Sequence, residues 1–104
     1  MSKRQDFAPK LVGATQDVVF EFLGELAVGE TISTATVTAA VYSGTDASPS
    51  SLISGSASAS GTQVSQKLTG GEEGVIYKLT CTVTTSASNT LVSTGFLAVI
   101  PDLP

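Results

Sequence analysis

The residues best able to do chemistry in this 104-residue chain are one cysteine, Cys81, and nine carboxylates, and the sequence contains no histidine. Histidine is the commonest general base and the commonest metal ligand, so its absence removes the usual partner of a serine or cysteine nucleophile. Cys81 stands between Leu79 and Val83 in an alternating apolar stretch. A cysteine in that setting behaves as a small, inert hydrophobe. We therefore expect Cys81 to be structural.

The carboxylates are grouped around turns instead of facing one another across a site. Glu72 and Glu73 are neighbours in a glycine-rich turn, Glu25 and Glu30 flank a second turn, and Asp46 lies in a serine-rich loop. Glycoside hydrolysis needs two carboxylates on either side of a sugar bond. Calcium needs about six to eight oxygen ligands. Neither pattern is present, and we expect solvated turn charges, no catalytic, cofactor-binding or metal-binding residues, and no enzymatic activity.

Two tyrosines and a glycine-rich turn are the remaining candidates for a site. Residues 70–74 do not form a phosphate loop, because no helix follows to present its amides. Sugar-binding surfaces usually stack the sugar on exposed aromatic residues. Tyr42 is the one aromatic residue expected to be exposed, so the case for a sugar-binding surface is weak. Tyr77 follows the glycine-rich turn, where a tyrosine of an immunoglobulin-like sandwich can bond back to the preceding loop. The alternative is an ordinary core tyrosine with some other hydroxyl partner.

The net charge of −4 and the small number of basic residues argue against nucleic acid as a partner. Three of the five basic residues, Lys3, Arg4 and Lys10, lie within the first ten positions, where they form either a small basic arm or a solvated terminus. No apolar run is long enough to span a membrane or to form a signal peptide. With a single cysteine no intrachain disulfide can form, which fits either synthesis in a reducing cytoplasm or a fold that needs no bridge.

Alternation of apolar and polar residues predicts an all-β domain. The pattern is clear at residues 17–23, 31–42, 62–69, 75–85 and 90–100, with Gly95 marking a bulge in the last. Residues 43–61 fit either a flexible loop or additional short strands. The total of about seven strands predicts an immunoglobulin-like antiparallel β-sandwich.

The predicted organisation is an extended N-terminal arm, residues 1–9, followed by one sandwich domain, residues 10–104. The apolar faces of the predicted strands define the expected core. Its members are Val18, Phe20, Phe22, Val37, Leu68, Tyr77, Leu79, Cys81, Val83, Leu97 and Val99.

Two segments resemble small structural proteins of bacteriophage virions. Residues 70–99, GGEEGVIYKLTCTVTTSASNTLVSTGFLAV, are similar to the C-terminal half of such proteins: a Gly-Gly turn, Gly-x-x-Tyr, alternating strand residues, a Thr-Thr-Ser hairpin and a final strand. Residues 17–33, DVVFEFLGELAVGETIS, resemble their N-terminal half. The resemblance implies an immunoglobulin-like virion protein of the head decoration, cement, neck or tail accessory type, with no catalytic residues to carry over.

The expected function is therefore that of a phage structural subunit in the virion. Its expected partners are capsid, neck or tail proteins, with self-association of the chain and no nucleic acid or membrane partner. Low charge between residues 31 and 71, where Asp46 and Lys67 are the only charged residues, fits an interface. The N-terminal arm is expected to take part in the contact. The alternative function is a cell-surface adhesion module with an immunoglobulin-like fold, and a free-standing inhibitor is also open.

Overall fold

The computed structural model describes residues 4–7, 9–22, 24 and 26–101. Within this part of the chain there are eight strands and one short 3₁₀ helix. Their bounds are β1 Arg4–Asp6, β2 Lys10–Leu11, β3 Gln16–Glu21, β4 Ile32–Ser43, η1 Pro49–Leu52, β5 Ile53–Ser60, β6 Gln63–Leu68, β7 Ile76–Thr85 and β8 Thr90–Ile100.

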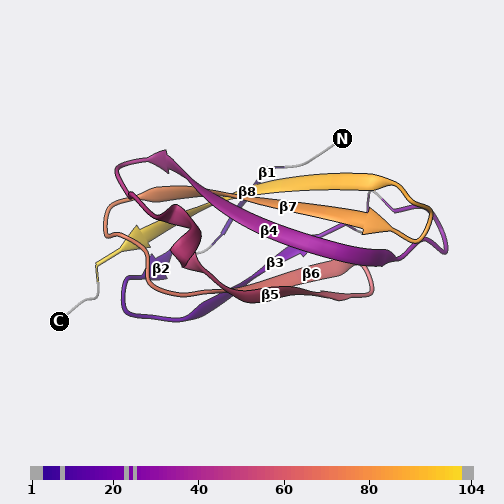
Figure 1. Cartoon of the computed structure of the whole chain (residues 1–104), viewed down its shortest axis with the longest axis horizontal. Coiled ribbons are helices and arrows are strands. Elements are labelled where there is room, and N and C mark those ends of the chain that lie inside the picture. The colour runs from indigo at the N-terminus through magenta and orange to yellow at the C-terminus, as the bar shows by residue number, and fades with distance from the viewer. Residues whose placement is uncertain (1–3, 8, 23, 25, 102–104) are drawn as a thin grey trace.

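The strands form two sheets that pack face to face, which confirms the predicted β-sandwich (Figure 1). The larger sheet has the order β1-β8-β7-β4, with β2 also paired to β8, and the smaller has the order β3-β6-β5. The sandwich is elongated, with extents of 47 × 20 × 20 Å. Its longest ladders are the antiparallel pairs β4–β7 and β7–β8, whose Thr- and Val-rich sequences suit a pleated, half-buried surface.

The N-terminal strands depart from the expected antiparallel pattern. Both β1 and β2 run parallel to β8, and Arg4–Asp6 of the predicted arm is therefore an edge strand of the chain's own sheet. The division into residues 1–9 and residues 10–104 stays a prediction, as does the immunoglobulin-like topology.

The segment that the sequence left open, residues 43–61, holds η1 and one continuous strand, β5. The pairing of β5 with β6 shifts register between Ser54 and Ser58. Gln66, a buried residue of β6, donates its side-chain amide to the carbonyl oxygens of Ser54, Gly55 and Lys67 at 3.1, 3.2 and 3.0 Å. The amide thus satisfies carbonyls of the bulge, which is how this irregular ladder stays hydrogen-bonded.

The core between the sheets contains every residue predicted for it. All of the predicted core side chains are buried, and Leu52, Val64 and Val75 join them. Burying one such side chain fully contributes about 1.5–3 kcal/mol. The bulge predicted at Gly95 is wrong: its pairing with Leu79 is part of an unbroken register from Ile76 to Thr84.

Candidate functional site

No enclosed site appears in the described part of the chain. It contains no pocket, and no three or more Cys, Asp or Glu residues within it are grouped to hold a metal ion. None of its helices is long and apolar enough to cross a membrane.

Glu72 and Glu73 are exposed, as predicted, whereas two other carboxylates hold turns together. Glu30 accepts hydrogen bonds from the hydroxyl of Thr85, from the backbone amide of Ala27 at 2.8 Å and from the side-chain amide of Asn89 at 3.0 Å. These bonds, the Thr85 bond first, lower the pKa of Glu30 because they stabilise its charged form. Glu30 is thus structural, and Glu25 lies outside the described residues.

Tyr77 bonds back to the turn before it, as the sequence pattern indicated. Its hydroxyl accepts a hydrogen bond from the backbone amide of Glu72 at 2.7 Å and donates one to Asp46 at 2.6 Å. Asp46 also accepts from the amide of Ser48 at 2.8 Å, so it is a turn-forming residue and not the freely solvated charge expected. The Tyr77 hydroxyl therefore ties the 43–52 loop to the glycine-rich turn.

The glycine-rich turn has a packing role. Gly71 has a φ of +92°, and a Cβ on it would lie 2.9 Å from Val99 Cγ2 and 3.2 Å from Leu52 Cδ1. Only glycine fits this backbone position without displacing the core. Because the neighbours are core side chains, the turn is built for close packing.

Lys10 corrects the expectation of a basic arm or solvated terminus at this position. It is 0% exposed. Its ammonium group donates to the carbonyl oxygens of Leu11 at 2.8 Å, Val12 at 3.4 Å and Gly70 at 2.8 Å. A buried ammonium is tolerated when its hydrogen bonds are made, and here they join β2 to the glycine-rich turn. Lys10 is therefore not available to a partner, and Lys3 lies outside the described residues.

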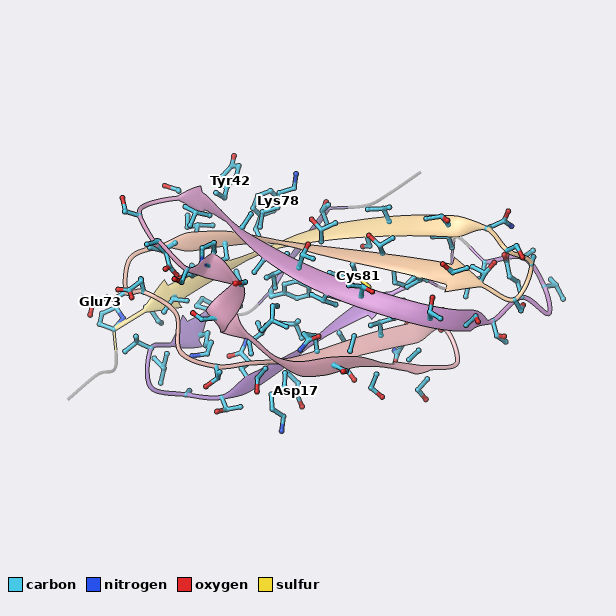
Figure 2. All side chains as sticks on the ribbon, viewed as in Figure 1. Asp17, Tyr42, Glu73, Lys78 and Cys81 are labelled. Atoms are coloured by element: carbon cyan, nitrogen blue, oxygen red, sulfur yellow. The ribbon has the colours of Figure 1, made fainter. Side chains whose placement is uncertain are left out.

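Cys81 lies between the sheets, fully buried (Figure 2). Burial raises the pKa of its thiol to about 12, so the reactive thiolate is almost absent near neutral pH.

We expect a thiol reagent at about pH 8 to label Cys81 only after unfolding, because the thiol is buried and protonated. Mass spectrometry of the protein with and without denaturant measures this. The unfolded chain, labelled under the same conditions, is the control for reagent activity. Rapid labelling of the folded protein would show that Cys81 is not a packed core residue.

The outward sides of three strands of the larger sheet, β4, β7 and β8, are almost without charge. The strands β4, β7 and β8 turn eight threonines outward in register: Thr34, Thr36, Thr38, Thr80, Thr82, Thr84, Thr90 and Thr94. We call this set the threonine face. Lys78 is the one charged residue that β4, β7 and β8 present on this side. Such depletion of charge is typical of the centre of protein interfaces.

An aromatic cluster lies at one end of the same side. The rings of Tyr42 and Phe96 meet edge to face, with centroids 4.6 Å apart, and Tyr42 is 60% exposed. Ile100, at the end of β8, is 39% exposed. Figure 2 shows Tyr42 and Lys78 pointing away from the sandwich together. We call Tyr42, Phe96 and Ile100 the aromatic end; sequence reasoning identified only Tyr42 because the pairing that adds Phe96 is not local.

The outer face of the smaller sheet has a different chemistry. Asp17 and Glu21 of β3 and Lys67 of β6 are exposed there, among the serines of β5. The Glu21 carboxylate accepts hydrogen bonds from the hydroxyl of Thr62 at 2.6 Å and from the side-chain amide of Gln63 at 2.8 Å. Figure 2 shows Asp17 on the side opposite Tyr42. The two broad surfaces of the molecule therefore offer two unlike chemistries.

Comparison with protein families matches residues 10–98 to one family, described as podophage GP4 fiber-tail adaptor protein gp77. No curated protein matches the chain. Because the match covers most of the 104 residues, the chain belongs to this family. It is accordingly a structural protein of a bacteriophage virion, which confirms the coarser part of the resemblance stated above.

Proposed function

We propose that the chain links a tail fibre to the phage tail, through protein–protein contacts alone. The observation that carries this proposal is the family match, whose description names a fibre-tail adaptor. Head decoration, cement and neck roles, which the sequence resemblance also implied, receive no support from that description. No observation on the described residues favours the adhesion alternative.

An adaptor has to bind two different partners, and the two faces of this sandwich suit that task. The larger sheet presents threonines and the aromatic end, whereas the smaller sheet presents Asp17, Glu21 and Lys67. The two faces lie on opposite sides of a body about 20 Å thick. Two partners bound there would not compete for the same surface.

The aromatic end is the best candidate for the main contact. Tyr42 combines a large apolar surface with a hydroxyl, and tyrosine is enriched among the residues that dominate binding energy. Its ring is already fixed against Phe96, so little conformational freedom is lost on binding. Lys78 pairs with Phe96 and is the one charged residue that β4, β7 and β8 place beside this end. The threonines farther along the same face are short and uncharged, and they can be desolvated at low cost relative to charged groups.

The test is incorporation of a Tyr42→Ser variant into phage particles. We expect about a tenfold or larger loss of the chain from purified virions, with a matching loss of attached fibres in electron micrographs. Val28→Ser is the matched control, because Val28 is a fully exposed apolar residue in a turn away from the aromatic end. Equal incorporation of both variants and the wild type would overturn the assignment of the aromatic end.

The contact predicted for the N-terminal arm stays a prediction. In the structure Arg4–Asp6 pairs with Thr94, Gly95 and Phe96 of the same chain.

A further inference from the structure

Three of the four sheet edges carry features that discourage further strand pairing. The larger sheet ends at β1 and β2, of three and two residues, with Pro9 between them. The edge strand β3 exposes Asp17 and Glu21. The edge strand β5 is interrupted by its bulge, where Gly55 has a φ of +74°. Short strands, charges, proline and bulges are the usual means by which proteins block edge-to-edge association.

The fourth edge, β4, is neither short nor charged and holds no proline, and its irregular pairing is confined to its two ends. It is 12 residues long and contains no charged residue, no proline and no glycine. Its pairing with β7 is irregular only near its ends, between Ile32 and Thr34 and between Val41 and Ser43. The regular part, residues 34–41, is about 27 Å long at the usual rise of a strand. Figure 1 shows β4 as the outermost strand of its sheet, next to β5 of the other sheet.

The core side of β4 is also incompletely covered. Its inward-facing residues Ala35, Ala39 and Val41 are only partly buried. The residues opposite them on β7, which are Val83, Leu79 and Tyr77, are completely buried. A strand added along the free edge of β4 would cover this remaining apolar surface and would pair its unpaired backbone groups.

We propose that the occupant of this edge is β4 of a second copy of the chain, paired antiparallel about a two-fold axis. A two-fold interface must be complementary to itself, and a strand without charge meets no like charge when it faces its own copy. A two-fold axis through Val37 or Thr38 places outward threonines opposite outward residues and inward residues opposite inward ones. Threonine pairs across antiparallel strands are favourable. The result is one sheet that runs through both copies.

The oligomeric state of the full chain in solution tests this pairing. We expect sedimentation at about 1 μM to about 1 mM protein to show a species of twice the 10.5 kDa chain mass. The double variant Thr36→Lys, Thr38→Lys places four lysines across the two paired strands. We expect it to weaken association at least about tenfold, since like charges directly opposite destabilise strand pairs.

The matched control is Thr82→Lys, Thr84→Lys, which adds the same charge to the same face on the interior strand β7. Thr82 is the direct neighbour of Thr36, and both are exposed. Because the backbone of β7 is already paired on both sides, with β8 and with β4, this control should associate as the wild type does. Loss of association in the control and the edge variant alike would indicate face-to-face packing and overturn the edge pairing. A monomer at all concentrations, or an assembly larger than two, would also overturn it.

Hydrogen exchange at low and high protein concentration locates the contact. We expect slower exchange at high concentration in residues 34–41, with no change in β3 or β5. Concentration-dependent protection confined to another edge would refute the proposal. The proposal does not depend on the fibre-tail role, because its readout is association of the isolated chain and not incorporation into particles.

Discussion

Replacing Leu79 by alanine is expected to lower the free energy of unfolding by about 2–5 kcal/mol. Leu79 is completely buried. It pairs with two small residues, Ala39 on β4 and Gly95 on β8, so its side chain supplies the volume in this layer of the core. Neither partner can fill the cavity that alanine leaves. Because small domains have a total stability of about 5–15 kcal/mol, this loss is a large part of the whole.

Urea denaturation followed by circular dichroism measures the loss. Thr82→Ala is the control, because Thr82 lies on the same strand but faces solvent, and it should stay within about 0.5 kcal/mol of the wild type. A Leu79→Ala variant as stable as the wild type would contradict the packing described here, as would a far-UV spectrum dominated by helix.

Replacing Tyr77 by phenylalanine is expected to cost about 1–3 kcal/mol of stability. The ring would still fill its place in the core, but the Glu72 amide would lose its acceptor and Asp46 would keep the Ser48 amide while losing the Tyr77 hydroxyl as a donor. The loss therefore reports on the link between the 43–52 loop and the glycine-rich turn. Tyr42→Phe, which removes an exposed hydroxyl, is the matched control.

The difference in the free energy of unfolding between the wild type and Tyr77→Phe should depend on pH in the alkaline range. Burial, and then the bond to Asp46, raise the pKa of Tyr77 from 10.0 to about 12. The folded state thus favours the neutral phenol of Tyr77. The contribution of the Tyr77 hydroxyl to stability is complete below pH 10.0 and is lost as the pH rises to about 12. The gap between the two proteins should narrow across this window. A gap that widened there would contradict the bonding of Tyr77.

Alternation alone predicted the core, because a residue that faces the opposite sheet must be apolar wherever one face of a strand is buried. This rule identified Phe20, Leu79 and Val83 without any knowledge of strand partners. It missed Leu52, which follows Pro49 and two serines and has no alternating neighbours, so no local pattern marks it.

Features that depend on distant partners were not predictable in the same way. Lys10 is buried because carbonyl oxygens of Leu11, Val12 and Gly70 converge on it, and Gly70 is 60 positions away. The parallel pairing of β1 with β8 likewise leaves no trace in the pattern of residues 4–6. A bulge was predicted at Gly95 because glycine is rare inside strands, yet Gly95 is buried and lies in a regular ladder.

The candidate surface was predicted in part. The low charge of residues 31–71 pointed to an interface, and Tyr42 was the one aromatic residue expected to be exposed. The strand register shows how the two features combine. The pairing of Lys78 with both Ala40 and Phe96 brings β4, β7 and β8 together at the aromatic end. The contrast with the charged face of the smaller sheet required the fold, since β3 and β6 are more than 40 positions apart in the sequence.

The central claim is that the chain occupies the junction between tail and fibre. A cryo-EM reconstruction of the phage particle tests it most directly. The account predicts density for a sandwich of 47 × 20 × 20 Å at that junction, with Tyr42 buried against a neighbouring protein. Density for this domain on the capsid lattice, or a tail-fibre junction without it, would contradict the account.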